Sequence, residues 1–190
     1  VFYPDVIHFG TEDRIRQNPE FDLSALIKRH FIQAQSPFRR SVFEKTGGYC
    51  EHDTLRLGME DVDFWYGMLE TGACFHRLSH PVYRYRIHPG SLSQRMQHHN
   101  YEIRCFIADR HRKLLYGRLR QEFLQAGAIR SYRTAVICRD WRNALSSSFH
   151  IYRHCLWPPK MWWRASWNIA DALKKISGLK ITDKPGSQGA

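Results

Sequence analysis

Three carboxylates lie within four positions of the segment GMEDVDFWYGMLETG at residues 58–72: Glu60, Asp61 and Asp63. Large apolar residues follow almost at once: Phe64, Trp65, Tyr66 and Met68. A carboxylate at the edge of such a stretch can act as a general base if a defined pocket presents it to a hydroxyl proton. An Asp has an ordinary pKa of about 4, so the pocket must place it for proton transfer in the transition state.

A helix over residues 61–71 would carry these acids. Its apolar positions follow the i, i+3, i+4, i+7 pattern of a core-facing stripe: Val62, Trp65, Tyr66 and Leu69. At ~100° per residue, Asp61 lies roughly 90° from the centre of the stripe and Glu60 lies nearly opposite it. Phe64 and Met68 add apolar surface on the far side, so we expect the helix to be covered on more than one face.

Helix capping is an alternative role for the acids. Acids in a first turn accept hydrogen bonds from unpaired N–H groups and complement the helix dipole, for up to ~1 kcal/mol each. Capping explains one of the three acids well and two tolerably, so both interpretations stay open. Asp61 and Asp63 also form a D-x-D sequence, but residues i and i+2 of a helix point apart, which disfavours a metal site here.

Short strands and helices alternate over residues 1–95. The pattern predicts strands at 1–9, 31–36 and 81–88, and helices at 23–30 and 39–49. Asp22 is placed to cap the first of these helices, and Gly47-Gly48 to end the second. Apolar residues recur at helical spacing after about residue 96, which predicts three or four helices up to residue 177 and a loose tail at 178–190. The fold class is therefore α/β, with a helical C-terminal extension.

The composition is that of a folded basic protein. Lys and Arg number 29 against 18 acids, for a formal charge of +11, which favours an anionic partner over an uncharged one. The five cysteines form no C-x-x-C pair and are odd in number, as expected of reduced thiols in the cytoplasm. No apolar run reaches the ~18 residues of a membrane span.

Three segments, taken in order and spacing, resemble the C-terminal, acceptor-side half of a family 2 glycosyltransferase. FIQAQSPFRRSVFEKTGGYCE resembles the acceptor-side segment, GMEDVDFWYGMLETG the acidic signature, and PVYRYRIHPGSLS the closing strand of that family. The resemblance covers residues 1–95. It implies a partial GT-A-like, Rossmann-related mixed sheet with flanking helices.

The resemblance also implies an activity: inverting transfer of a sugar from a UDP- or GDP-sugar to a hydroxyl of a saccharide or lipid-linked acceptor. Asp61 matches the catalytic base, and Glu60 would orient the acceptor or support that base. Arg86 would offset leaving-group charge, and His88 would ligate a divalent metal (Mg or Mn) or touch phosphate. The alternatives are a strand residue paired with an acid for Arg86 and a polar strand end for His88.

Four further residues are assigned to substrate binding by the resemblance: Arg40, Gly47, Gly48 and Asp63. Asp63 would also hold the helix start or a nearby Arg. The family's nucleotide-binding strands and metal-binding D-x-D belong to an N-terminal half that this sequence does not contain. We therefore expect a fragment of a larger enzyme, inactive on its own.

A Trp-rich basic segment at residues 157–177 suggests a second kind of partner. Trp mixed with Lys and Arg is typical of a helix lying on an anionic bilayer, and the alternative is packing against the catalytic domain. Nucleic acid is disfavoured because no recognised binding module accompanies the segment. A non-catalytic basic module for membrane or nucleic acid is thus the alternative function. The expected location is the cytoplasm, with peripheral contact at the inner face of the plasma membrane.

Overall fold

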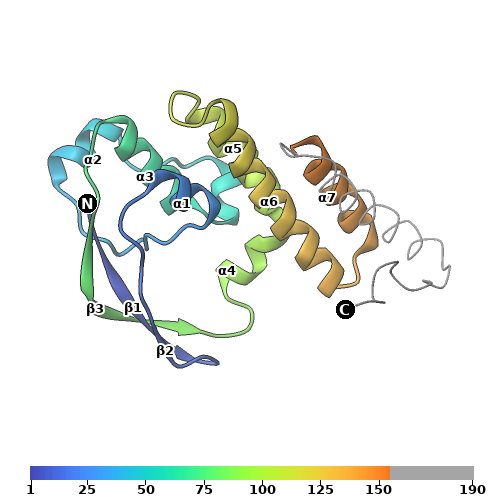
Figure 1. The fold of residues 1–190 in the computed structure, drawn as a ribbon, viewed down its shortest axis with the longest axis horizontal. Helices are drawn as coiled ribbons and strands as arrows, with labels where there is room; N and C mark the ends of the chain where they lie inside the picture. The colour runs from blue at the N-terminus through green and yellow to red at the C-terminus, as the bar shows by residue number, and fades with distance from the viewer. Residues whose placement is uncertain (155–190) are drawn as a thin grey trace, which may run out of the picture.

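A computed structural model describes residues 1–154 of the chain (Figure 1). The elements are β1 (Phe2–Gly10), β2 (Arg14–Arg16), α1 (Leu23–Lys28), α2 (Arg40–Thr46), the 3-10 helix η1 (Asp53–Leu57), α3 (Glu60–Glu70), β3 (His76–Ile87), α4 (Leu92–Arg95), the 3-10 helix η2 (Met96–His99), α5 (Asn100–Arg110), α6 (Gly117–Ile137) and α7 (Trp141–Arg153). The predictions for residues 157–177 and 178–190 lie outside the described residues.

The three strands form one mixed sheet in the order β2-β1-β3. β1 pairs antiparallel with β2 and parallel with β3, although β3 begins more than sixty residues later in the sequence (Figure 1). The predicted α/β class with a mixed sheet is confirmed. β1 matches its predicted range, whereas β3 begins five residues before the predicted strand because its ladder with β1 continues through an irregularity opposite Pro81.

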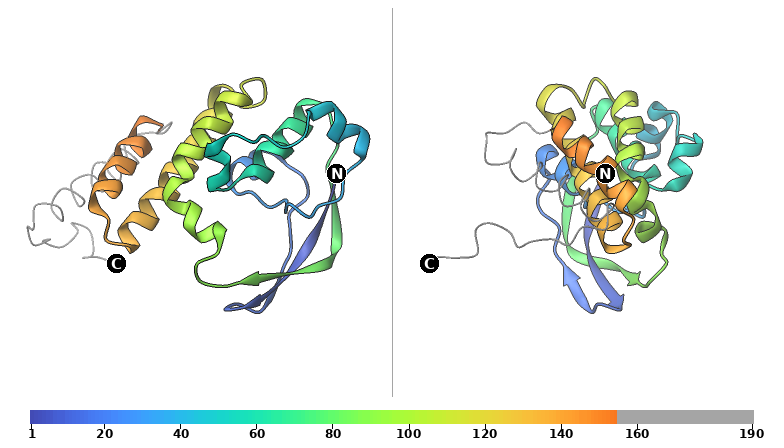
Figure 2. Two further views of the ribbon diagram at one scale, coloured as in Figure 1. Left: turned by 180° about the vertical axis from the view of Figure 1, so that it is seen from behind. Right: turned by 90° about the vertical axis from the view of Figure 1, so that its right-hand side faces the viewer.

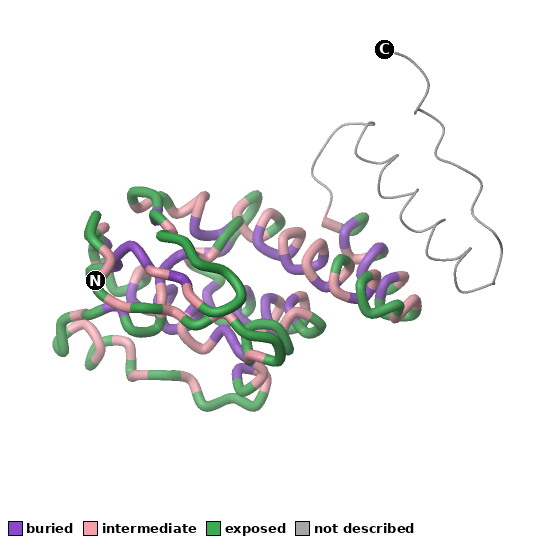
Figure 3. The backbone as a smooth tube through the Cα atoms, turned by 90° about the horizontal axis from the view of Figure 1, so that it is seen from below, coloured by how far each residue is buried: buried purple, intermediate pink, exposed green. Residues whose placement is uncertain are grey.

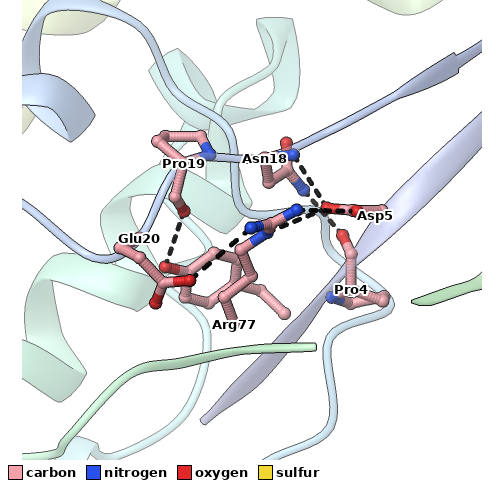
Figure 4. Close-up of polar contacts among 7 residues, drawn as sticks. Pro4, Asp5, Asn18, Pro19, Glu20 and Arg77 are labelled. Carbon is pink, nitrogen blue, oxygen red and sulfur yellow. Dashed lines mark hydrogen bonds and ion pairs between the residues drawn. The ribbon is translucent and has the colours of Figure 1, made fainter. Parts of the chain in front are cut away.

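Asp5 organises the place where the register between β1 and β3 shifts (Figure 4). Its carboxylate accepts two hydrogen bonds from Arg77, at 3.1 and 2.9 Å, and one from the backbone N–H of Asn18 at 2.8 Å. The Asn18 amide donates in turn to the carbonyl oxygen of Pro4 at 2.6 Å. Burial raises the pKa of Asp5, but these donors outweigh it and hold the pKa below its ordinary value. The network ties β3 and the loop after β2 to β1.

Local sequence signals set the helices that flank the sheet. Asp22 caps α1 by accepting the backbone N–H of Ala25 at 2.8 Å, and α2 ends at Gly47, which has a left-handed φ of 76°. Both predictions are confirmed. The strand predicted at residues 31–36 is wrong. Phe31 and Ile32 are buried as a strand pair would be, but the chain then enters a turn and finds no partner strand.

Helix α3 lies at the centre of the hydrophobic core and confirms the helix predicted at 61–71. Trp65 and the far-side residues Phe64 and Met68 are all buried, so the helix is covered on more than one face. The same core includes apolar residues of β1, α1, α5 and α6, from both sides of residue 95. Helices α5, α6 and α7 lie side by side, next to the layer that holds α3 (Figure 2).

A buried guanidinium joins these two parts. Arg104 of α5 is 0% exposed and donates to Asn100 Oδ1 at 3.0 Å and to the carbonyl oxygens of Ile27 and Phe123, each at 3.1 Å. Its guanidinium also lies 4.3 Å from the centre of the Phe123 ring. Burial lowers the pKa of Arg104 to about 10. Figure 3 shows in purple the buried stretches along the helices.

Gly127 allows α6 to approach α5 closely, so we expect Gly127→Ala to destabilise the fold. A Cβ at this position would lie 2.6 Å from Arg104 Cδ and 3.2 Å from the carbonyl oxygen of Asn100. Ala normally stabilises a helix interior relative to Gly, but overpacking costs about 1–3 kcal/mol. Urea unfolding measures the change.

Gly67→Ala in α3 is the matched control. The added Cβ would meet its nearest neighbour, His111, at an ordinary 3.8 Å. This variant should be as stable as the parent or more so. Equal effects of the two substitutions on the free energy of unfolding would show that the stability does not depend on close approach of the helices at Gly127.

Candidate functional site

The two carboxylate oxygens of Asp61 have separate partners. Oδ1 accepts the backbone N–H of Val62 at 2.8 Å, which is a helix-capping contact. Oδ2 lies 3.4 Å from His30 Nε2, an ion-pair distance at which the two groups do not form a well-aligned hydrogen bond. The side chain is 21% exposed, so it is partly sheltered and still reachable. Asp61 therefore accepts a backbone N–H in the first turn of α3 and faces a cavity at the same time.

The pKa of Asp61 lies below its ordinary value. Burial alone would raise it, but the charge of His30 and the hydrogen bonds at the helix start lower it by more. The carboxylate is thus ionised at neutral pH and able to accept a proton.

An unusual backbone turn sets the start of α3. Gly58 has a φ of 128°, and Met59 follows with a left-handed φ of 66°. A Cβ at Gly58 would lie 2.9 Å from Met96 Sδ, so this position also needs glycine for space. A positive φ at a long side chain is strained, and such strain gathers at functional sites. The turn aims Glu60 and Asp61 at the cavity rather than along the preceding loop.

The cavity in front of Asp61, here called the Asp61 pocket, has a volume of about 380 Å³. It lies between the β-sheet, the segment after α1, the start of α3 and helix α6. Its polar lining residues are His8, Arg16, His30, Gln33, Gln35, Glu60, Asp61, Tyr85, Ser93 and Arg130. Apolar side chains from α4, η2 and β3 close one side. A cleft of this size with a few convergent polar groups is the usual form of a small-molecule site.

Asp63 lies elsewhere. Its carboxylate is 3% exposed and accepts from Arg110 Nε and His111 Nε2, each at 3.0 Å. It lines a second cavity that includes Gly48 and not Asp61. The expectation that Asp63 holds a nearby Arg is confirmed, as is the expectation that Asp61 and Asp63 point apart on the helix.

The other predicted site residues do not line the Asp61 pocket. Arg40 is 90% exposed and pairs with Glu44 one turn along α2. Gly47 and Gly48 end α2 beside Phe43. Arg86 is exposed on β3, between the pocket-lining residues Tyr85 and Ile87, so strand alternation puts it on the other face of the sheet.

His88 is exposed at the end of β3, and its Nδ1 lies 2.9 Å from the carbonyl oxygen of Pro89. Over residues 1–154, no group of three or more His, Cys, Asp or Glu side chains could hold a metal ion. These residues alone therefore do not fit a divalent metal. Within the same range, no helix has the length and apolarity needed to cross a membrane.

Sequence reasoning missed three residues that meet Asp61 in the pocket: His30, Arg16 and Arg130. They come from the segment after α1, from β2 and from α6, so no local spacing connects them. His30 joins two of the groups, because its ring faces Asp61 and its carbonyl oxygen accepts Arg16 Nη2 at 3.3 Å. The local signal was the basic run at residues 28–30, in which His30 lies beyond the end of α1.

Comparison with known protein families, with curated proteins and with solved structures finds no match for this chain.

His30→Gln should raise the pKa of Asp61, because it removes the largest of the influences that lower that pKa. A carboxyl carbon NMR titration of the 190-residue chain measures it. In the parent we expect a value below the ordinary 3.8. His8→Gln changes a histidine that lines the same pocket beside Glu12 and should leave Asp61 unaffected. An unchanged titration in His30→Gln would show that His30 does not stabilise the ionised base.

Deprotonation of His111 should make the protein less stable at alkaline pH. Both ring nitrogens face carboxylates, Glu70 at 2.9 Å and Asp63 at 3.0 Å, so both must donate and the ring fits best when protonated. Burial lowers the pKa of His111, but the two carboxylates raise it above the ordinary 6.5 overall. The stabilisation is complete below pH 6.5 and is lost as the pH rises through the native pKa.

Urea unfolding at about pH 5.5 and about pH 8.5 compares the protein below the ordinary pKa of histidine and well above it. His111→Gln should remove most of the decrease in the free energy of unfolding between the two pH values. His99→Gln changes an exposed histidine and is the control. If both variants keep the parent's pH dependence, another group is responsible.

Proposed function

We propose that this chain supplies the acceptor side of an inverting family 2 glycosyltransferase with a GT-A-like fold, and that Asp61 is its general base. One observation carries the proposal. The ionised carboxylate of Asp61 lies at the strained start of a buried helix and faces a concave polar pocket. Asp61 belongs to the sequence segment that most resembles the family, residues 58–72. A rigid helix holds a reacting group more accurately than a loop does.

In the proposed reaction the acceptor hydroxyl enters the Asp61 pocket and attacks the anomeric carbon of a nucleotide-sugar. Its proton passes to the Asp61 carboxylate, and a new carbon–oxygen bond forms. The bond to the nucleoside diphosphate breaks and its electron pair leaves with the diphosphate, so the configuration inverts. A carboxylate can accept about four hydrogen bonds, so the contacts with Val62 and His30 leave Asp61 able to receive the proton.

The neighbours of Asp61 fit this role. His30 favours the ionised form of the carboxylate. Glu60 lines the same pocket and is placed to hydrogen-bond a second hydroxyl of a saccharide acceptor. In the family that the chain resembles, other strands bind the donor nucleotide and its Mg or Mn ion. Arg86 and His88 remain candidates for contact with that donor.

Asp61→Asn should lower kcat of the intact enzyme by about 10² or more, because general base catalysis contributes ~10²- to 10⁴-fold. The Asn side chain keeps the shape and can still accept the Val62 N–H, so the melting temperature should change little. Turnover with saturating acceptor and donor, together with a thermal melt, measures both effects.

Asp63→Asn is the matched control two residues away and should show the reverse. It weakens a buried network with Arg110 and His111, so it should lower the melting temperature while largely sparing kcat. If Asp61→Asn instead lowers the melting temperature and leaves kcat near normal, Asp61 is a capping residue only and the proposal is wrong.

A further inference from the structure

Two guanidinium groups enter the Asp61 pocket without an acidic partner. Arg16 of β2 and Arg130 of α6 are half-buried and line the cavity. In the part of the chain that the structure describes, no ion pair joins either of them to a carboxylate. Arg16 donates to the carbonyl oxygen of His30 at 3.3 Å. Other arginines of the fold, such as Arg14 and Arg120, have carboxylate partners at 2.8 and 2.7 Å.

The charged groups that lower the pKa of these two side chains are other arginines. Burial and the charge of Arg29 are the largest influences that lower the pKa of Arg16, and Arg130 also lowers it. Burial and Arg29, followed by Arg133, lower the pKa of Arg130. Like charges held together in a partly buried place raise the free energy of the protein unless an anion lies among them.

The pocket also contains carboxylates, and they limit where an anion fits. Asp61 lies beside the His30 ring, with Oδ2 3.4 Å from His30 Nε2, and so on the side of the cavity away from β2 and α6. Glu60 lines the side of the cavity formed by the start of α3, whereas Arg16 and Arg130 come from β2 and α6. An anion is therefore favoured at the arginine side. Gln33, Gln35 and Ser93 add hydrogen-bonding groups to the cavity lining.

We propose that Arg16 and Arg130 bind a phosphoryl group carried by the acceptor, close to the hydroxyl that Asp61 activates. The guanidinium fork matches the oxygens of a phosphate and binds it in two-point fashion. His30 places the two functions side by side, because its ring faces Asp61 and its carbonyl contacts Arg16. The phosphate site follows from the arginines alone, whereas its assignment to the acceptor rests on the proposed function.

Titration of the 190-residue chain with inorganic phosphate, followed by NMR of the arginine side chains, tests the site. Sedimentation with phosphatidylglycerol vesicles, against phosphatidylcholine vesicles, tests whether a lipid headgroup supplies the phosphate. The double variant Arg16→Gln/Arg130→Gln should weaken binding about tenfold or more, since charged hydrogen bonds to both side chains are lost. This applies to whichever probe binds the parent, inorganic phosphate or phosphatidylglycerol vesicles. Arg112→Gln removes the same kind of charge at an exposed ion pair with Asp109 and should bind as the parent does.

Arg16→Lys/Arg130→Lys keeps both charges and should retain more phosphate binding than the Gln pair, which separates loss of the site from loss of folding. Asp61→Asn should bind phosphate at least as well as the parent, so a failure of the catalytic proposal would leave this result intact. The phosphate site is overturned if neither probe binds, or if the Gln pair binds as Arg112→Gln does. Tighter binding of UDP than of phosphate through the same two arginines would assign the site to the donor and overturn its assignment to the acceptor.

Discussion

The buried guanidinium of Arg104 is the contact on which the arrangement of the pocket depends. Among residues 1–154 it has no carboxylate partner, and it is satisfied by Asn100 Oδ1 and by the carbonyl oxygens of Ile27 and Phe123. The Ile27 carbonyl belongs to the last turn of α1, where carbonyls lack partners within the helix and favour a cation. Arg104 thereby fixes α6 against α1. Arg130 lies seven residues after Phe123, about two helical turns along α6. Because Arg104 holds α6 in place, the position from which Arg130 reaches the cavity is also held.

Helix α3 uses its acids for two different tasks. Successive residues are ~100° apart, so Asp61 and Asp63 point about 200° away from one another around the axis. Asp61 faces the pocket and keeps 21% of its side chain exposed, whereas Asp63 is buried against the end of α5. The network of Asp63 with Arg110 and His111 anchors the helix. The same four-residue run thus combines a structural anchor with a candidate base, and neither role excludes the capping contact of Asp61 with Val62.

Much of the local structure could be predicted from the sequence, and the pocket could not. The apolar stripe identified α3, and the special preferences of Asp22 and Gly47 set the helix ends. The strand expected at residues 31–36 does not form, because apolar composition indicates burial but does not show that a neighbouring strand is present to pair with it. Arg104 has a charged side chain, and the hydrophobic periodicity of the sequence predicts that such a residue lies outside the core. His30 and Arg130 are 100 residues apart, and only the tertiary packing of α6 against α1 brings them to one cavity.

The lowered pKa of Asp61 fits a base that acts late in the proposed reaction. A carboxylate with a low pKa is ionised before the acceptor arrives, so no proton has to be removed first. It is also a weak base toward a resting hydroxyl, whose pKa is far higher. Transfer becomes favourable only as the hydroxyl oxygen bonds to the anomeric carbon and its proton becomes acidic. Water or a misplaced hydroxyl in the pocket would therefore stay protonated. In this arrangement, proton transfer depends on correct placement of the acceptor, and both Glu60 and the arginine side of the pocket carry charge that can provide that placement.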